Sequence, residues 1–224
     1  MSCPLESFIR SSTTITPVKL VPELQLHLAC DSQRIFQRAD ELERPGERLQ
    51  PFWAFAWPGG QALARYMIDT PALVRGRRVI DIGAGSGIAA IAAMQSGARA
   101  ALAADVDPLA ELAIRLNAAA NGVTVETTTR DVLGAPIDAD LVVIADLVYE
   151  PELATRVAAF LEAAAGAGID VLLADRTNAR RPPLSFSLMA EYDAPLTPDM
   201  HDLNVEKARL WRLDQRRGRR MQRR

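Results

Sequence analysis

The sequence is poor in the side chains that most often build metal centres and disulfide frameworks. It holds two cysteines and two histidines in 224 residues. Cys3 and Cys30 lie far apart, as do His27 and His201, so neither pair has the short spacing of metal ligands. We therefore expect no metal site and no disulfide framework, and thiols that stay reduced inside the cell.

Long hydrophobic runs are also missing. No stretch approaches the roughly 18 uncharged residues that a membrane-spanning helix needs. The first residues lack the apolar centre of a signal peptide. The sequence therefore predicts a cytoplasmic protein that does not cross a membrane, and we expect it to be a monomer or to associate weakly.

Lysine is scarce, since Lys19 and Lys207 are its only representatives and the other basic residues are arginines. Six of these arginines lie in the last nine residues. Such a cluster can bind an acidic protein surface or a nucleic-acid backbone. A solvated, disordered terminus is the simpler interpretation.

The hydrophobic content of 49% is enough to bury one substantial core. No second periodic block indicates another domain. We divide the chain into an N-terminal extension over residues 1–50 that could cover a substrate, a main domain over residues 51–214, and an arginine-rich tail over residues 215–224.

Predicted strands and helices alternate through the main domain. Strands are expected at residues 78–82, 100–104, 123–127, 140–145 and 170–174, and helices at residues 61–68, 88–96, 109–121 and 151–165. This alternation is typical of an α/β fold whose parallel sheet carries helices on both faces. Two late segments, residues 186–192 and 205–213, are expected to form an antiparallel pair at the sheet edge.

The front of the chain shows weaker patterns. The alternating residues Leu24 to Leu28 predict a short strand with His27 on its solvent side. Residues 31–50 form a polar segment that carries a proline and a glycine, and this front portion is a candidate lip or cover over the substrate.

The sequence VIDIGAGSGIAAI at residues 79–91 predicts a strand, a tight turn and a helix N-terminus. Gly83, Gly85 and Gly87 would let the backbone turn sharply and approach a ligand closely. A lone glycine-rich turn is often only a tight connection. In this sequence a second strand and further acidic residues follow, so we expect a nucleotide-like ligand.

Acidic residues indicate which ligand the turn accepts. Asp81 lies inside the motif, where a carboxylate attracts a cationic or amino-bearing ligand and repels a pyrophosphate. Asp105 ends the next strand, at a spacing suited to ribose hydroxyls. Asp107, before a proline, is expected to cap the following helix. The pattern therefore favours S-adenosylmethionine over a dinucleotide.

Two further strand ends should meet the same crevice. Asp131 follows the third strand and is suited either to an adenine amino group or to stabilising its own turn. After the fourth strand, Asp146 and Tyr149 place a carboxylate and a phenol beside the expected methyl donor. We therefore expect the substrate chemistry there.

Four blocks of the chain resemble a known family. These are PFWAFAWPGGQALARY at residues 51–66, DIGAGSG at 81–87, ADVDP at 104–108 and D-x-x-Y at 146–149. Together they resemble the seven-strand protein-lysine methyltransferases that modify the β subunit of electron transfer flavoprotein. The similarity runs from Pro22 to Leu213. It implies a Rossmann-like, seven-stranded methyltransferase fold with a mostly parallel sheet and an antiparallel edge hairpin.

The resemblance also implies roles for single residues. Trp57, Gly59 and Gln61 would border the cofactor or the lysine channel, and Asp146 with Tyr149 would receive the lysine. We assign Trp57 to the cofactor. We assign three residues to the substrate: Trp53, Gln61 and Asp175. A polar loop that could bind an acidic target follows Asp175. The simpler interpretation of the aromatic residues is a packed edge under the first helix.

Other acceptors and roles remain open. A ribosomal protein or a small molecule could take the methyl group. Nucleic acid is disfavoured, because enzymes of this fold that methylate base amines typically carry two prolines and an aromatic residue where Leu147 and Val148 follow Asp146. A non-catalytic nucleotide-binding subunit is the third hypothesis, and it would transfer no methyl group at all.

Overall fold

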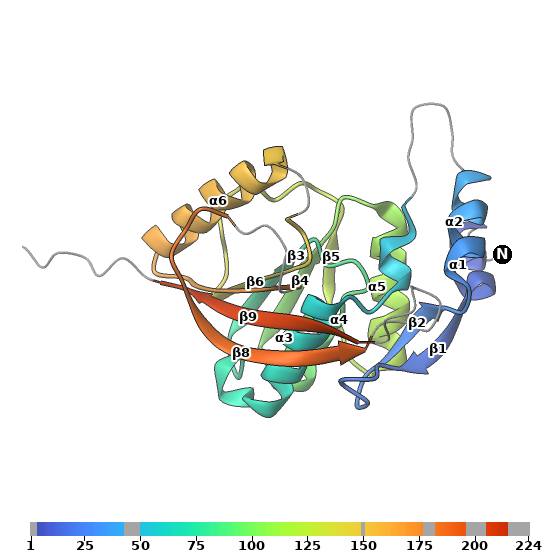
Figure 1. The fold of residues 1–224 in the computed structure, drawn as a ribbon, viewed down its shortest axis with the longest axis horizontal. Helices are drawn as coiled ribbons and strands as arrows, with labels where there is room; N and C mark the ends of the chain where they lie inside the picture. Colours follow the sequence, from blue (N-terminus) through green and yellow to red (C-terminus); the bar gives the residue numbers. More distant parts are fainter. Residues whose placement is uncertain (1–3, 43–49, 149–150, 177–181, 196–204, 215–224) are drawn as a thin grey trace, which may run out of the picture.

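The computed structural model describes residues 4–42, 50–148, 151–176, 182–195 and 205–214. Its centre is a seven-stranded sheet with the strand order β5-β4-β3-β6-β7-β9-β8 (Figure 1). The strands are β3 (Arg78–Ile82), β4 (Ala100–Ala104), β5 (Glu126–Thr128), β6 (Leu141–Ala145), β7 (Asp170–Arg176), β8 (Phe186–Pro195) and β9 (Val205–Leu213).

The strand directions confirm the fold expected from the sequence. β5, β4, β3, β6 and β7 are parallel, while β9 pairs antiparallel with both β7 and β8. β5 begins later than predicted. The Val123 N–H donates to the Ala118 carbonyl of α5, so Val123 still belongs to the C-terminal cap of that helix. The strand therefore starts after it.

Four helices cover the sheet. They are α3 (Pro58–Asp69), α4 (Ile88–Gln95), α5 (Pro108–Ala120) and α6 (Pro151–Gly166). Alternate residues of β3 face opposite layers: Val79 packs in the cluster that holds α3 and α4, whereas Ile80 and Ile82 pack with α6. The main domain is therefore a three-layer α/β sandwich (Figure 1).

The N-terminal extension holds more structure than the sequence indicated. It contains α1 (Pro4–Ser12), β1 (Thr13–Pro17), β2 (Gln25–Ala29) and α2 (Ser32–Asp40), which lie beside α5 (Figure 1). The sequence indicated no helix in the polar segment from residue 31 onward, yet this segment contains α2. Only Ile35 and Ala39 of that helix are buried, so its apolar stripe was too thin to stand out.

The prediction for His27 was also wrong, because this side chain is buried and only 5% exposed. Its Nδ1 lies 3.1 Å from the Thr13 hydroxyl, and its backbone N–H donates to Asn117 Oδ1 at 2.7 Å. Asn117 Nδ2 in turn donates to the Ser86 carbonyl in the glycine-rich turn. Both faces of β2 are covered by other parts of the protein. The alternation of apolar and polar residues therefore did not indicate which face meets solvent. Burial, with the Arg10 charge, lowers the pKa of His27.

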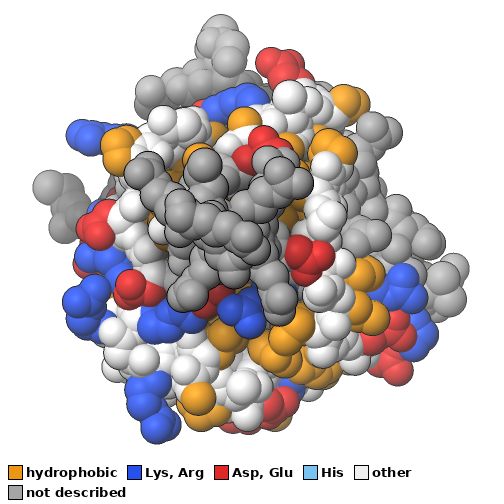
Figure 2. Space-filling model, turned by 90° about the vertical axis from the view of Figure 1, so that its left-hand side faces the viewer, with side chains coloured by type: hydrophobic (Ala, Val, Ile, Leu, Met, Phe, Trp, Pro, Cys, Tyr) orange, Lys and Arg blue, Asp and Glu red, His pale blue; other side chains and the backbone are white. Residues whose placement is uncertain are grey.

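Charges of both signs are interspersed on the face in Figure 2, with hydrophobic side chains among them. On the antiparallel edge, Lys207 pairs with Asp193 at 3.1 Å and with Glu191 at 3.4 Å, while Arg209 pairs with Glu191 at 2.6 Å. Within the described part of the chain, no helix has the length and apolar character needed to cross a membrane.

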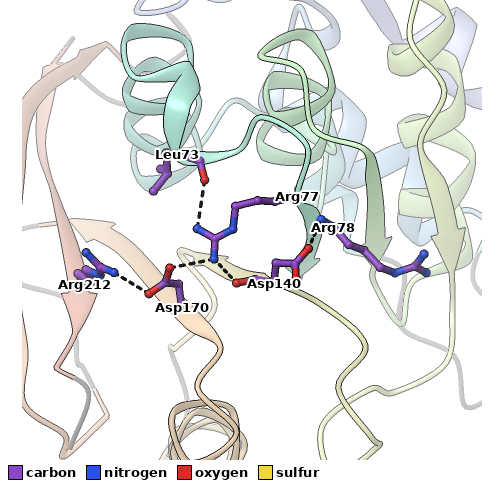
Figure 3. Close-up of polar contacts among 6 residues, drawn as sticks. All are labelled: Leu73, Arg77, Arg78, Asp140, Asp170 and Arg212. Carbon is purple, nitrogen blue, oxygen red and sulfur yellow. Dashed lines mark hydrogen bonds and ion pairs between the residues drawn. The ribbon is translucent and has the colours of Figure 1, made fainter. Parts of the chain in front are cut away.

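A polar network ties the strands together at the edge where β6 and β7 begin (Figure 3). The Arg77 guanidinium donates to the Leu73 carbonyl, to the Asp140 carbonyl and to Asp170 Oδ2. Arg212 of β9 donates to the other oxygen of Asp170 at 2.6 Å. One guanidinium thus joins the connections before β3, β6 and β7.

Replacing Arg77 with alanine should lower the free energy of unfolding by about 1–3 kcal/mol, because several partly buried acceptors lose a charged donor. Urea denaturation measures the change. Arg75→Ala is the control, since the Arg75 side chain is exposed and makes no hydrogen bond or ion pair with the described residues, and its backbone bond to the Pro71 carbonyl is kept in the variant. Equal unfolding midpoints for the two variants would contradict this role of Arg77.

Candidate active site

A cavity of about 950 Å³ lies where the parallel strands end. Its lining includes residues after β3, β4, β5 and β6 and the last two residues of β7, together with the aromatic segment before α3. Helices follow β3, β4 and β6, so the chain diverges above the sheet and leaves a crevice there. The structure therefore brings together most of the residues that the sequence assigned to a ligand.

The glycine-rich turn has the conformation that the motif predicts. Gly83, Gly85 and Gly87 have φ angles of +67°, +51° and +77°, which glycine adopts without a steric penalty. A Cβ at Gly83 would lie 2.6 Å from a Leu147 methyl carbon. A Cβ at Gly85 would meet no atom within 4 Å, so this residue leaves open space at the cavity lining.

Asp81 lies beneath this turn and is 2% exposed. Its Oδ2 accepts the Ala90 N–H of α4 at 3.1 Å, and burial together with the nearby Asp105 raises its pKa to about 7. An N–H in the first turn of α4 is thereby already bound by the protein's own carboxyl. A pyrophosphate at this helix end would meet an acidic group in place of that donor.

Asp105 holds the turn from the neighbouring strand. Its Oδ2 accepts the Gly85 N–H at 2.8 Å and its Oδ1 accepts the Asp107 N–H at 3.0 Å. Asp105 lines the cavity, and burial raises its pKa. Carboxylate oxygens have further lone pairs, so ribose binding stays a prediction consistent with this position. The predicted cap is confirmed, since Asp107 Oδ1 accepts the Leu109 N–H at 2.8 Å.

Asp131 also lines the cavity, and its described contacts are within the protein. Its Oδ1 accepts the Leu133 N–H at 2.9 Å, as expected for a residue that stabilises its own turn, and its Oδ2 pairs with Arg156. The Arg156 guanidinium holds the pKa of Asp131 below its usual range. The predicted contact with an adenine amino group remains a prediction.

The aromatic block combines packing with contact to the cavity. Trp57 lines the cavity and donates from Nε1 to the Phe52 carbonyl at 2.9 Å. Trp53 is 1% exposed and meets Phe8 edge to face at a centroid distance of 6.1 Å. Its Nε1 has no hydrogen-bond partner among the described residues, although Trp53 borders the cavity. Phe55 is buried, which fits the packed-edge interpretation.

The structure does not bring Gln61 to the cavity. Its Nε2 donates to the carbonyls of Ala56 and Pro195 at 2.7 and 2.8 Å, and its Oε1 accepts the Leu20 N–H at 3.4 Å. The side chain lies on the face of α3 that meets these backbone segments, which corrects its placement at the substrate. Gln61 joins the N-terminal extension to the end of β8.

Asp146 occupies an unusual position at the end of β6. It is the only non-glycine residue with a positive φ among those described, at 50°, a conformation that aspartate tolerates at some energetic cost. Its Oδ2 accepts the Gly60 N–H at the start of α3, at 3.1 Å. Its Oδ1 is buried without a hydrogen-bond partner in the described part of the chain.

Asp175 lies beside Asp146 because their preceding residues, Ala145 and Ala174, are register partners in β6 and β7. Asp175 is 6% exposed, and both carboxyls line the cavity. Burial and the charge of Asp175 raise the pKa of Asp146 to about 8, and burial raises that of Asp175 to about 6. Near neutral pH the pair therefore retains one proton.

This pairing is the feature that sequence reasoning missed. Asp146 and Asp175 were assigned separately, although both directly follow the predicted ends of neighbouring strands. The predicted roles of Tyr149 and of the loop after Arg176 fall largely outside the described residues. Besides this pair, the described cavity lining holds five more acidic side chains: Asp81, Asp105, Asp107, Asp131 and Glu152.

Known proteins are similar to this chain in sequence and in fold. A family model described as ribosomal protein L11 methyltransferase matches residues 62–178. Two similar curated proteins are named electron transfer flavoprotein beta subunit lysine methyltransferase. The one from Mus musculus is 38% identical over 161 residues, or 70% of this chain and 62% of that protein. The one from Rattus norvegicus is 34% identical over 215 residues, or 92% of this chain and 83% of that protein.

Among solved structures, a candidate RNA methyltransferase from Pyrococcus horikoshii superimposes with a TM-score of 0.56. It is 14% identical, and the match covers 82% of this chain and 98% of that one. At this identity the likeness concerns the fold.

The buried pair predicts how stability depends on pH. A carboxyl whose pKa is raised on folding favours the folded state most below the ordinary aspartate pKa of about 4. This contribution is lost as the pH rises toward the raised value of about 8. Asp146→Asn cannot ionise, and asparagine tolerates the positive φ. The variant should therefore gain stability over the wild type by at least about 1 kcal/mol between pH 5 and pH 8.

Urea denaturation at several pH values measures this difference in the protein without ligands. Asp138→Asn serves as the control, because the Asp138 side chain is 93% exposed. A stability difference between Asp146→Asn and the wild type that does not change with pH would contradict the raised pKa.

Proposed function

Because the chain belongs to the family of the electron transfer flavoprotein β subunit lysine methyltransferases, we propose that it methylates a lysine side chain of that flavoprotein subunit. The protein is an S-adenosylmethionine-dependent methyltransferase with the seven-stranded fold. One observation carries the acceptor chemistry. The glycine-rich turn and the Asp146–Asp175 pair line the same cavity, so a cationic donor and a cationic amine can approach the same carboxyls.

The residues present fit this donor. The positive φ of Gly85 and the space beside it allow close approach of a ligand to the backbone. Asp105 is suited to the ribose hydroxyls, Asp131 to the adenine amino group, and Trp57 to the edge of the cofactor. Asp81 disfavours a pyrophosphate in the same place. When bound, the cofactor would supply a methyl group on a sulfonium, which is already a good methyl donor because a neutral thioether leaves.

The protein must then bind the acceptor, whose amine must be neutral to attack the methyl group. A free lysine has a pKa of about 10.4, so its amine is almost fully protonated at neutral pH. Asp146 would receive this ammonium, and burial beside the sulfonium would lower the lysine pKa. Alignment of the amine with the S–CH3 bond can contribute about 7–11 kcal/mol. Tyr149, outside the described residues, would orient the amine.

Asp146 is better suited to binding than to strong base catalysis. A negative carboxylate beside the ammonium opposes the loss of its proton, whereas the sulfonium favours that loss. The Gly60 N–H fixes one oxygen of Asp146 and leaves the buried Oδ1 free for the amine. We therefore assign Asp146 to orientation of the lysine.

A second acceptor is a ribosomal protein. The name of the family model that matches residues 62–178 supports this alternative, while the names of the longer-matching relatives favour the flavoprotein subunit. A small-molecule acceptor has no comparable support. We also propose a cytoplasmic, monomeric or weakly associating protein, for which the exposed free thiol of Cys30 suits a reducing compartment.

Incubation of the protein with labelled S-adenosylmethionine should label a lysine of purified electron transfer flavoprotein β subunit, as identified by mass spectrometry. Asp146→Asn and Tyr149→Phe should each lower the rate by about 100-fold or more, because they remove groups that position the amine. The affinity for the donor, measured by calorimetry, should change by only about threefold in Tyr149→Phe, which alters no charge.

The exposed control Asp138→Asn should transfer at the wild-type rate. Ribosomal protein L11 serves as the competing acceptor. Faster transfer to L11 would reject the flavoprotein subunit as substrate, and wild-type rates in both Asp146→Asn and Tyr149→Phe would reject the proposed lysine site.

A further inference from the structure

Methyl transfer changes the charge of the cofactor. The S–CH3 bond breaks and its electron pair stays on sulfur, while the amine nitrogen forms the new N–CH3 bond. The sulfonium cation thereby becomes a neutral thioether, and the positive charge passes to the methylated amine. A site that responds to this charge can distinguish the donor from its product.

The cavity contains groups suited to such a response. Asp146 and Asp175 are side by side at the ends of β6 and β7, and both line the cavity that the glycine-rich turn borders. The Gly60 N–H bonds one oxygen of Asp146, while the other is buried and unpartnered among the described residues. Neither carboxyl takes part in an ion pair within the described part of the chain.

We infer that Asp146 and Asp175 together make the cavity bind the cationic methyl donor more tightly than its neutral demethylated product, so that methyl transfer itself favours release of the product. The inference deepens the proposed function, since it rests on S-adenosylmethionine as the donor. It is independent of the identity of the acceptor protein.

The charges around the pair leave this response possible. Arg176 follows Asp175 on β7, but its guanidinium lies 3.7 Å from Glu206 and its side chain is 53% exposed. On β9, Arg209 is the register partner of Asp175, and it pairs with Glu191 at 2.6 Å. Both cations therefore have acidic partners outside the pair, and of the two the Arg176 charge also acts on Asp175, where it lowers the pKa against the larger effect of burial.

The other elements packed against Asp146 add little positive charge. The start of α3 contributes the N–H groups of Gly59 and Gly60, which carry only partial charges. On β3, Arg78 pairs with Glu126 and Asp138 outside the cavity, and the titratable group in the cavity lining is Asp81, whose Oδ2 bonds the Ala90 N–H. Asp81 would add to the preference for a cation when it ionises.

Two adjacent carboxyls in a buried site repel each other when both are charged. An entering cation reduces this repulsion, so it favours loss of the proton that the pair retains. A neutral thioether gives no such compensation. Binding of the donor should therefore release a proton near neutral pH, whereas binding of the product should release much less.

Calorimetry tests the inference with S-adenosylmethionine and S-adenosylhomocysteine as the two probes. Between pH 6 and pH 9, the ratio of their affinities should shift toward the donor by about tenfold or more in the wild type, as a pKa change of one unit or more requires. In Asp175→Asn and in Asp146→Asn the shift should largely disappear. At pH 7, the binding enthalpy of the donor should depend on the ionisation enthalpy of the buffer.

Asp81→Asn tests a different carboxyl in the same lining. It keeps an oxygen for the Ala90 N–H and should lose only the part of the pH-dependent shift that ionisation of Asp81 itself contributes, whereas the exposed control Asp138→Asn should retain the whole shift. Thermal unfolding checks that each variant is folded. A shift that persists unchanged in both variants of the pair, or one abolished by Asp81→Asn alone, would overturn the inference.

These measurements need no acceptor protein, so they separate two kinds of failure. Tight binding of both probes with a pH-independent affinity ratio would overturn the role of the pair and leave the proposed methyltransferase function standing. Binding of neither probe would overturn the proposed function, and the inference with it.

Discussion

The close approach of α3 to the ends of β6 and β7 is the constraint on which the site depends. A Cβ at Gly59 would lie 2.5 Å from the Ala174 carbonyl oxygen and 2.8 Å from Asp146 Oδ2, and one at Gly60 would lie 2.9 Å from an Ile88 methyl carbon. Only glycines allow this contact. It places the helix N-terminus on Asp146, fixes one carboxyl oxygen and leaves the other for the cavity.

The same contact explains why a strained and electrostatically unfavourable arrangement persists. Asp146 has a positive φ, and its charge is opposed by burial and by Asp175. Each feature lowers the stability of the folded state. Each persists because the packing of the surrounding elements holds the residue in place. Such arrangements are common at functional sites, where a group must be ready for a ligand before the ligand arrives.

Much of the fold could be predicted because its signals are local. The bounds of β3 and β4 and the cap at Asp107 agree with the patterns of apolar residues and turn residues. The misses depend on packing. α2 has a thin apolar stripe, His27 is buried because a second element covers β2, and Gln61 bonds backbone groups from distant segments. The Asp146–Asp175 contact follows from strand register, which no local pattern shows.

The near absence of lysine has a consequence for a lysine methyltransferase. Lysine amines on the enzyme's own surface have a high effective concentration at its active site. They would therefore compete with the lysine of the acceptor protein. Here Lys207 is held by Asp193 and Glu191, which raise its pKa and keep its lone pair protonated. Arginine supplies the positive charge elsewhere without an amine that could be alkylated in this way. At neutral pH the Lys207 amine therefore stays protonated and is a poor methyl acceptor.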